Sequence, residues 1–305
     1  MGTRPAPLRG LARTVTSRRP PQQARPQAAF AVREDHDPGA APVTYDSPSP
    51  ASVPALSPAH EALLAQVPVG EHSVIEVGTI AYEHEDLPLE GYLARDVQSD
   101  ERRPAVLILH DWHGVGDTVR MRAQMLARRG YVAFAADLFG AGVRPSGDAS
   151  PTEAGKYYRD LPLLRARVAA GFGWLQQHPA VDPARLAVIG YCFGGTAALE
   201  FARTGAPARG VVSFHGGLIA HDPSDAAAIA ASVLVLTGGS DPVVPDEAVV
   251  AFEEELRGTP HVDWQLTTYS GAPHAFTIPD GDRYRPLADA RSWRALVCFL
   301  DEVVA

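Results

Sequence analysis

Cys192 stands in a setting that suits a nucleophile. It lies in the pattern Gly-Tyr-Cys-Phe-Gly at 190–194, between the apolar run Leu186–Ile189 and a run at helical spacing that begins at Thr196. The two glycines permit a sharp turn from strand to helix, where a side chain would crowd the backbone. The positive end of the helix would favour a thiolate and later an oxyanion. A lone pattern of this kind fits a buried structural cysteine equally well.

Asp241 and His274 supply the other two groups that a cysteine nucleophile needs. A thiol is mostly protonated at neutral pH, so it requires a base, and the base requires a carboxylate that orients it. Asp241 follows the apolar run Val233–Leu236, and His274 follows the alternating segment 263–271. Taken singly, such an aspartate caps a helix and such a histidine is an ordinary exposed residue. In the order nucleophile, acid, histidine, the three residues predict a catalytic triad.

The elements that must position these residues alternate between short apolar strands and helices. Two alternating runs within 74–96 predict an antiparallel hairpin at a sheet edge. Further strands are expected at Ala105–Leu109, Tyr131–Ala136, Leu186–Ile189, Gly210–Phe214 and Val233–Leu236. Helices are expected at Thr118–Arg129, Leu161–Gln177, Thr196–Arg203, Asp246–Arg257 and Pro286–Val304, with Pro245 as a first helical residue and Gly130 and Gly258 as helix ends. This alternation predicts an α/β fold, a mostly parallel twisted sheet with helices on both faces.

Several further side chains are expected at the edge of the sheet where the strands end, because ligands of such sheets bind beyond the carboxyl ends of the strands. The candidates for the pocket are His110, His113, Phe139, Tyr157, Tyr158, His215 and Phe276. A metal pair formed by His110 and His113 is conceivable, but no third ligand is evident, so pocket lining is favoured and no metal is expected. Cys298 is expected to be structural, on the apolar face of the last helix.

Composition restricts the class of protein and its partners. Residues 1–33 contain seven Arg and no acidic residue, so the remainder has 20 basic and 36 acidic side chains and a charge of about −16, which disfavours nucleic-acid binding. No run of about 18 apolar residues is present, so no membrane span is expected. Two cysteines make no disulfide framework, which favours the reducing cytoplasm. An organelle is the alternative, if the Arg-rich start is a transit peptide.

The first sixty residues are rich in Pro, Ala, Ser and Arg and have no sustained apolar period. Such a segment cannot form a core, so residues 1–60 are expected to be a disordered tail, or the product of a misassigned start codon, and residues 61–305 to form one catalytic domain.

Six blocks in order resemble the dienelactone hydrolase family over roughly Val74–Ala305. They are HDWHGV, YVAFAADLFGAG, HPAVDPARLAVIGYCFGG, GVVSFHGGL, VLVLTGGSDPVVP and GAPHAFTIP. The resemblance implies an α/β-hydrolase fold and hydrolysis of a small ester or lactone. No feature of the sequence demands a cofactor, and none is expected. The resemblance also implies a triad of Cys192, Asp241 and His274, with the backbone N–H groups of Trp112 and Phe193 as the oxyanion hole. An acyl-cysteine intermediate follows from the triad.

Two positions depart from the family pattern. Asp111 stands where members usually have a Glu that is thought to contact the resting thiol, and Asp111 is therefore expected to hold Cys192 less well or only to bond the backbone. Ile278 stands where chlorocatechol-pathway members have an Arg for the substrate carboxylate, so dienelactone itself is poorly supported. The expected partner is a small-molecule ester or lactone, and the chain is expected to be a monomer or a small homo-oligomer. A thioesterase, an acyltransferase or a non-catalytic small-molecule-binding protein remains an alternative.

Overall fold

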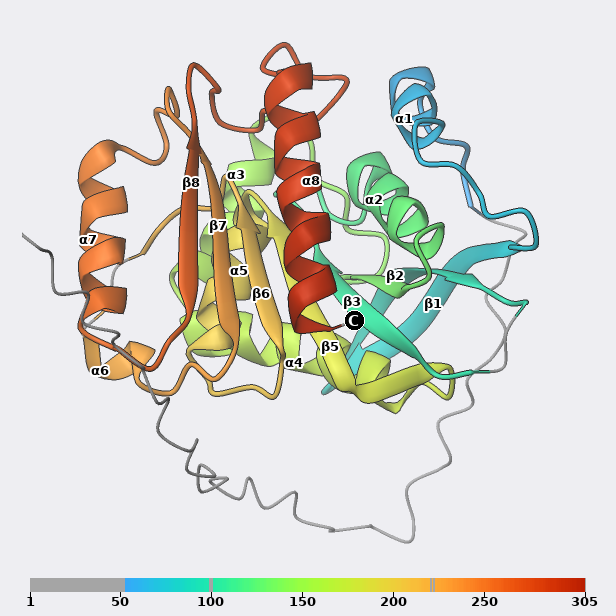
Figure 1. Cartoon of the computed structure of the whole chain (residues 1–305), viewed down its shortest axis with the longest axis horizontal. Helices are drawn as coiled ribbons and strands as arrows, with labels where there is room; N and C mark the ends of the chain where they lie inside the picture. Colours follow the sequence, from blue (N-terminus) through green and yellow to red (C-terminus); the bar gives the residue numbers. More distant parts are fainter. Residues whose placement is uncertain (1–52, 99–100, 220, 222, 305) are drawn as a thin grey trace, which may run out of the picture. The chain divides into compact units, whose positions relative to one another are not determined.

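A computed structural model of the chain describes residues 53–98, 101–219, 221 and 223–304. Its centre is an eight-stranded sheet in the order β1-β2-β4-β3-β5-β6-β7-β8 (Figure 1). The strands are β1 Ile75–His84, β2 Leu87–Asp96, β3 Arg103–Leu109, β4 Val132–Ala136, β5 Val181–Tyr191, β6 Gly210–Phe214, β7 Ser232–Gly238 and β8 Trp264–Tyr269. The helices are α1 Pro58–Leu64, α2 Asp117–Ala127, α3 Ala149–Tyr158, α4 Leu161–Gln177, α5 Phe193–Ala202, α6 Pro223–Ala226, α7 Asp246–Arg257 and α8 Pro286–Val303.

The expected hairpin and parallel sheet are both present. β1 and β2 pair antiparallel up to His84 and Leu87, and β2 also pairs antiparallel with β4. From β4 to β8 every pairing is parallel. The carboxyl ends of the parallel strands therefore meet at one edge, which is where the predicted site residues must lie. The fold is the α/β-hydrolase fold.

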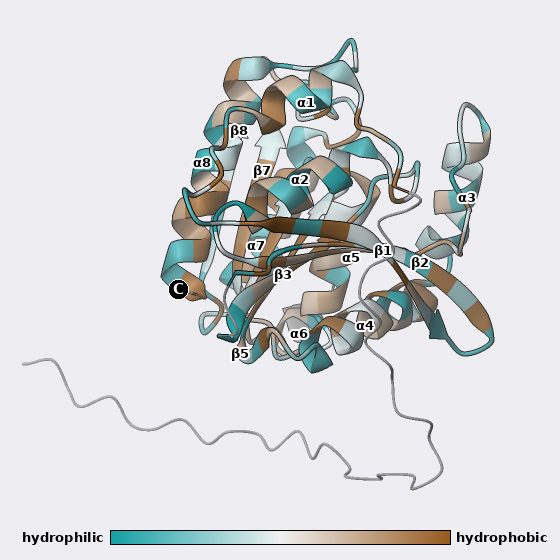
Figure 2. Cartoon of the chain, turned by 90° about the vertical axis from the view of Figure 1, so that its right-hand side faces the viewer, coloured by the Kyte–Doolittle hydropathy of each residue, from teal (hydrophilic) through white to brown (hydrophobic). Residues whose placement is uncertain are grey.

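Helices cover both faces of the sheet because side chains of each central strand alternate between two buried clusters. Val106 and Ile108 of β3 face the cluster that contains residues of α2 and α8. Leu107 and Leu109 of the same strand face the cluster that contains residues of α4, α5 and α7. Figure 1 shows α2 and α8 in front of the sheet and α4 and α5 behind it, and Figure 2 shows the apolar strands enclosed between these layers.

Several local expectations are corrected. The helix after the turn begins at Phe193, directly after Cys192, and not at Thr196. Pro245 is the cap residue before α7 and not its first residue. Cys298 is exposed, because a helix that buries Leu296 and Leu300 turns the position two residues after Leu296 to the opposite side. The sequence pattern also missed α1, α3 and the short α6.

Residues 53–67 pack on the domain, so the expectation that a disordered tail extends to residue 60 is wrong for its last eight residues; residues 1–52 lie outside the described part. Leu64 of α1 packs against Met121 and Met125 of α2. Arg128 donates hydrogen bonds to the carbonyls of Leu64 and Val67, each at 2.8 Å. The sequence concealed this helix because its seven residues bury only His60 and Leu64, too few to give a period.

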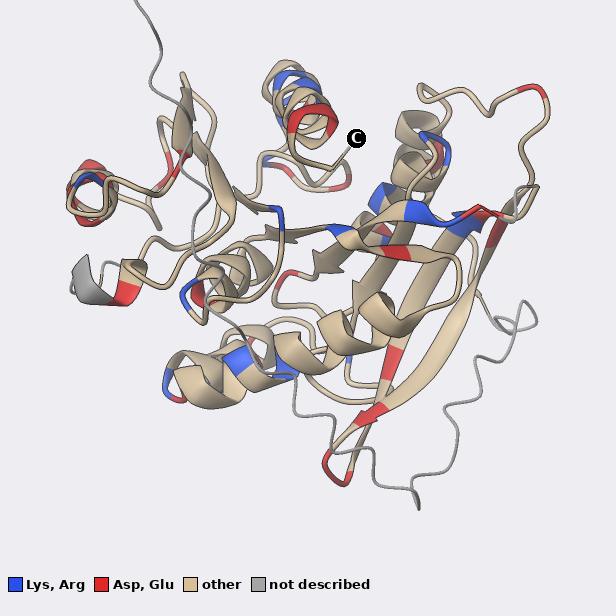
Figure 3. Cartoon of the chain, turned by 60° about the horizontal axis from the view of Figure 1, so that its bottom comes forward, with Lys and Arg blue, Asp and Glu red and all other residues tan. Residues whose placement is uncertain are grey.

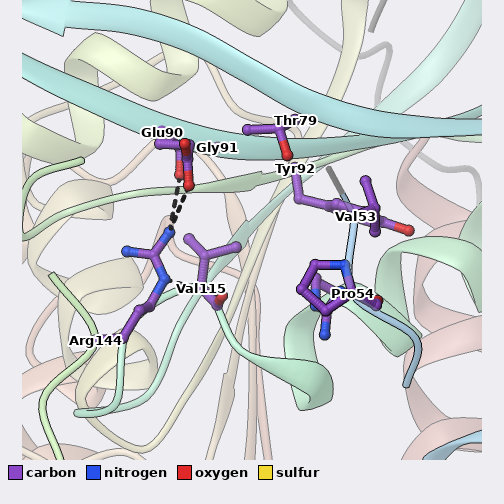
Figure 4. Close-up of a pocket in the computed structure, with 9 residues that line it drawn as sticks. Val53, Pro54, Thr79, Glu90, Gly91, Tyr92, Val115 and Arg144 are labelled. Carbon is purple, nitrogen blue, oxygen red and sulfur yellow. Dashed lines mark hydrogen bonds and ion pairs between the residues drawn. The ribbon is translucent and has the colours of Figure 1, made fainter. Parts of the chain in front are cut away.

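The chain enters the domain beside a cavity of about 320 Å³ at the edge of the hairpin. Figure 4 shows Val53 and Pro54 on one side of this cavity, with Arg144 paired to Glu90 on another. Arg120 of α2 donates to the carbonyl of Pro54 at 2.6 Å. Together with the α1 contacts, this bond holds the segment from residue 53 onward against α2.

Two properties of the described residues concern the classes of partner that the composition disfavours: the distribution of charged side chains and the apolar character of the helices. Figure 3 shows that Lys and Arg are interspersed with Asp and Glu along the ribbon of the described residues. Within the same residues, no helix combines the length and apolar character that crossing a membrane requires.

Candidate active site

Cys192 lies at a sharp turn between β5 and α5. Its backbone has φ +55° and ψ −115°, which is strained for a residue with a side chain, and its N–H donates to the carbonyl of Phe214 at 2.9 Å. A Cβ at position 190 would lie 1.9 Å from the carbonyl oxygen of Gly194, and a Cβ at position 194 would lie 2.3 Å from the carbonyl oxygen of Leu109. The two glycines are therefore a steric requirement of the turn, as the sequence predicted.

The structure brings Cys192, His274 and Asp241 together. The Nε2 atom of His274 lies 3.0 Å from the sulfur of Cys192, and its Nδ1 atom lies 2.9 Å from Oδ2 of Asp241. The other carboxylate oxygen of Asp241 accepts the backbone N–H groups of Val243 and Val244. With its second oxygen fixed in this way, Asp241 is oriented toward the imidazole, and the three side chains form a continuous hydrogen-bonded chain.

The neighbours of His274 raise the pKa of its imidazole. Burial lowers the pKa of its imidazole, but the hydrogen bonds and negative charges of Asp241 and Cys192 outweigh burial and raise this pKa to about 9. The imidazole is consequently protonated near neutral pH, and the Cys192 sulfur lies opposite a cation. Because part of the rise comes from Cys192, the pKa of His274 must fall when the sulfur loses its charge.

The loop that carries His274 is held from two sides. His215 places Nε2 at 2.8 Å from Oγ1 of Thr277. Arg122 of α2 donates to the carbonyl of Thr277 at 3.2 Å and is itself buried in an ion pair with Asp289 of α8. Burial, and next the charge of His274, hold the pKa of His215 well below its ordinary value, so His215 stays neutral. His215 thus lies near the site as expected, where it supports the loop of His274.

The two predicted oxyanion donors lie on either side of the turn. Phe193 is the first residue of α5, and Trp112 follows β3, whose last carbonyl touches the turn at Gly194. Among the described residues, neither backbone N–H donates a hydrogen bond within the protein. N–H groups of a first helical turn and of a loop that find no internal partner are available to an external acceptor.

His110 fixes the backbone that carries Trp112. Its Nε2 atom accepts the N–H of Leu138 at 3.0 Å, so Nδ1 carries the proton and donates to the carbonyl of Asp111 at 2.6 Å. Burial lowers the pKa of His110, which keeps this neutral tautomer. His110 is therefore a support of the loop, and its lone pair is already used, which removes it as a metal ligand.

Asp111 bonds the backbone, as one of its two predicted interpretations requires. Its Oδ1 accepts the N–H of His113 at 2.8 Å and closes a turn around Trp112. Asp111 is buried, and among the described residues it makes no hydrogen bond to the thiol. His113 in turn accepts the indole N–H of Trp112 at 2.8 Å and contacts Pro145 and Ser150. Asp111 and His113 thus shape the segment that presents the N–H of Trp112.

Among the aromatic pocket candidates, Tyr158 is exposed, whereas Phe139, Tyr157 and Phe276 are buried. Phe193 contacts the rings of Phe139, Tyr157 and Tyr158 at centroid distances of 5.3 to 5.9 Å. Tyr158 is 40% exposed, and partial burial, followed by the charge of Cys192, raises the pKa of its hydroxyl to about 12. Phe276 is fully buried against the ring of His215 and belongs to the core on the other face of the sheet.

Sequence reasoning missed three residues that contribute to the site: Arg122 and Thr277, which hold the loop of His274, and His60 of α1. His60 lines a cavity with Asp111, His113 and Ile278. No spacing in the sequence connects His60 or Arg122 to position 277, because only the packing of α1, α2 and α8 brings them together. Within the described residues, no cluster of three or more His, Cys, Asp or Glu could hold a metal ion.

Comparison with known proteins places this geometry in a family. The model of the dienelactone hydrolase family matches residues 89–304. The chain is 32% identical over 240 residues to a probable 2-oxo-3-(5-oxofuran-2-ylidene)propanoate lactonase from a Bradyrhizobium species, which covers 73% of this chain and 94% of that protein. Among solved structures, a dienelactone hydrolase-like promiscuous phosphotriesterase from metagenomic libraries is 35% identical with a TM-score of 0.73, covering 76% of this chain and 99% of that one. A putative dienelactone hydrolase from Klebsiella pneumoniae is 22% identical with a TM-score of 0.68, a likeness of fold.

Proposed function

The chain belongs to the dienelactone hydrolase family and is a carboxylic ester hydrolase, and we propose that it cleaves small esters or lactones through an acyl-Cys192 intermediate. The observation that carries the proposal is the hydrogen-bonded chain from Cys192 through His274 to Asp241 at a strained strand-to-helix turn. A small-molecule ester or lactone is thus the proposed partner. The cytoplasmic location and the oligomeric state stay predictions.

In the first step, the thiolate sulfur of Cys192 donates an electron pair to the carbonyl carbon, and the carbonyl electrons move to oxygen. The N–H groups of Phe193 and Trp112 would receive the resulting oxyanion. Collapse of this intermediate breaks the bond to the leaving alkoxide, which takes the proton from Nε2 of His274. The released alcohol and an acyl thioester of Cys192 are the products, and His274 is left neutral.

In the second step, the lower pKa of His274 keeps its imidazole neutral, so that it can act as a base. The acylated sulfur no longer carries charge, so part of the influence that raised this pKa is lost while burial remains. The neutral imidazole can then take a proton from water, whose oxygen attacks the thioester carbonyl. Collapse releases the carboxylic acid, and the sulfur leaves as the thiolate opposite the imidazolium. The carboxylate of Asp241 accepts the hydrogen bond from Nδ1–H of His274 and so keeps the proton on Nδ1 through both steps.

An active-site titration tests the proposal. A chromogenic aryl ester should give a burst of one phenol per Cys192, and alkylation of Cys192 by iodoacetamide should abolish turnover. Cys298→Ser provides the matched control, since Cys298 is the second thiol and is exposed on α8, an element that carries no member of the proposed triad. Full turnover by Cys192→Ala would refute the acyl-cysteine mechanism. Histidine-independent thiol reactivity with no turnover of any ester would indicate a non-catalytic binding protein.

A further inference from the structure

A cavity of about 230 Å³ lies between α1, the start of α2 and the loop that follows His274. Its walls include His60 of α1, Asp111 and His113 of the loop after β3, and Ile278. Asp111 precedes Trp112, and the N–H of Ile278 donates to the carbonyl of Ala275 in the turn that follows His274. The cavity is therefore bounded on two sides by the segments that carry the proposed oxyanion donor and the proposed base.

The position of the cavity relative to His274 indicates which part of a substrate it can receive. In the proposed mechanism, the leaving oxygen takes its proton from Nε2 of His274, so the leaving group departs on the side of this residue. The ring of Tyr158 packs against Phe193, the residue that follows Cys192, at a centroid distance of 5.5 Å, and Tyr158 is exposed. With the leaving group toward the cavity, the acyl part of the substrate would lie against Tyr158.

His60 is built into the wall of this cavity. It is 3% exposed, and its Nε2 lies 3.2 Å from Oγ1 of Thr118 at the start of α2. Its Nδ1 lies 2.8 Å from Oγ of Ser57 and 3.1 Å from Oδ2 of Asp280 in the loop after His274. Ser57 also donates its hydroxyl to Asp280 at 2.6 Å. α1 is thus tied to α2 and to the His274 loop, with His60 at the junction.

The charges around the cavity restrict the chemistry of its occupant. Carboxylates of Asp111, Asp117 and Asp280 line it, while position 278, which could hold a cation, is Ile. Burial lowers the pKa of His60, so this residue brings no positive charge near neutral pH. Arg120, the nearby cation, is already paired with Asp117. A carboxylate that entered would lose its hydration without gaining a cationic partner.

We infer that this cavity receives the leaving group of the substrate, that the leaving group is uncharged and about the size of one aromatic ring, and that His60 sets the size limit. The inference rests on the proposed function. The size follows from the volume, because an apolar cavity of about 150 Å³ holds a benzene molecule. His60 is a specificity-determining residue in this assignment, contributed by a helix that packs on the domain from the N-terminal side.

The test varies the alcohol and the acyl group separately. Phenyl acetate and 2-naphthyl acetate differ in the leaving group, whereas phenyl acetate and phenyl butyrate differ in the acyl group. His60→Ala should raise kcat/KM for the naphthyl ester relative to the phenyl ester by about fivefold, and His60→Trp should lower kcat/KM for phenyl acetate mainly through KM. Both variants should leave the acetate-to-butyrate ratio unchanged. Tyr158→Ala should change the acetate-to-butyrate ratio and leave the naphthyl-to-phenyl ratio unchanged.

Further variants separate the inference from folding defects. Glu61→Ala, an exposed neighbour on the same helix, is the matched control and should behave as wild type. Ile278→Trp fills the cavity from the opposite wall and should reproduce the effect of His60→Trp even if changes in α1 disturb folding. Ile278→Arg should raise the activity toward 4-carboxyphenyl acetate, which the wild-type protein should hydrolyse at least about tenfold less well than phenyl acetate.

The outcomes distinguish the inference from the proposed function. If the protein hydrolyses these esters but His60→Ala, His60→Trp and Ile278→Trp all leave the naphthyl-to-phenyl ratio unchanged, the cavity does not receive the leaving group. Equal changes in the alcohol and acyl series would also overturn the assignment, since they would show a general displacement of the site. Absence of hydrolysis of every ester, equal to that of Cys192→Ala, would contradict the proposed function itself.

Discussion

Replacing Asp241 by Asn should cause a defect whose size depends on pH. The hydrogen bond and the charge of Asp241 both raise the pKa of His274, and the burial that lowers it is unchanged in Asp241→Asn. The pKa of His274 must therefore fall from about 9. Acylation needs the protonated imidazole, which stabilises the thiolate and supplies the proton to the leaving group.

The expected loss of activity follows from the fraction of His274 that is protonated in the wild type and in Asp241→Asn. At pH 8, a pKa of about 9 leaves about nine-tenths of His274 protonated. If the variant returns this pKa to its ordinary value of 6.5, only about one molecule in thirty is protonated at pH 8, a loss of about 30-fold. At pH 5.5 the same two pKa values leave both proteins almost fully protonated, so this part of the defect vanishes. A loss of orientation, on the order of 10⁴-fold in comparable triads, adds to it at every pH.

The assay is kcat/KM for phenyl acetate from pH 5.5 to 9.5, combined with NMR titration of the His274 ring. Wild-type activity should fall as pH rises through about 9, and in the variant the fall should begin at lower pH. Asp263→Asn is the control, because Asp263 is exposed and its side chain makes no hydrogen bond to the residues that the structure describes, whereas its backbone carbonyl accepts the N–H of Val233. A ratio of wild type to variant that stays constant from pH 5.5 to 8 would refute this account of His274.

Three further outcomes are expected. Gly194→Ala should abolish activity and lower the melting temperature, because its Cβ would lie 2.3 Å from the carbonyl oxygen of Leu109; normal activity measured with phenyl acetate would contradict the steric account. Deletion of residues 1–52 should leave urea unfolding unchanged, whereas deletion of 1–67 should cost at least about 2 kcal/mol by removing α1; equal curves for the two would show that α1 adds no stability. The raised pKa of His274 contributes a free energy of unfolding of at most about 3 kcal/mol, which is complete below pH 6.5 and is lost as pH rises through about 9. The free energy of unfolding of His274→Gln should therefore depend less on pH over this range. Parallel pH profiles of the two free energies would exclude the effect.

The proposed triad could be predicted from the sequence because each of its members lies within a few residues of the end of a strand. Cys192 is marked by two glycines that steric contact requires, and Asp241 and His274 follow apolar runs that parallel pairing must bring to one edge. The order of the three along the chain then fixed their assignment. The fold class was accessible for the same reason, since alternating strands and helices allow few arrangements.

The supporting contacts were not accessible, because they depend on packing between elements far apart in the chain. The bond from His215 to Thr277 spans 62 residues and that from Arg122 to Asp289 spans 167. Neither pair has a spacing or a motif that local chemistry would require. α1 was missed because its two buried residues are too few to give a helical period. The assignment of Cys298 to the packed face of α8 was wrong because position 298 lies about 200° around the helix from the buried Leu296.

The boundary of α1 has a consequence for how this molecule could be altered. The region that matches the family model begins at residue 89, whereas α1 spans Pro58–Leu64 and contributes His60 to the cavity that Asp111 and Ile278 also line. In the proposed assignment, one determinant of the choice of alcohol, His60, therefore lies outside the matched region that carries Cys192, Asp241 and His274. Replacing residues 53–67 by the equivalent segment of a homologue should change which alcohols the protein accepts. The exchange would leave the proposed proton-transfer residues Cys192, Asp241 and His274 unchanged.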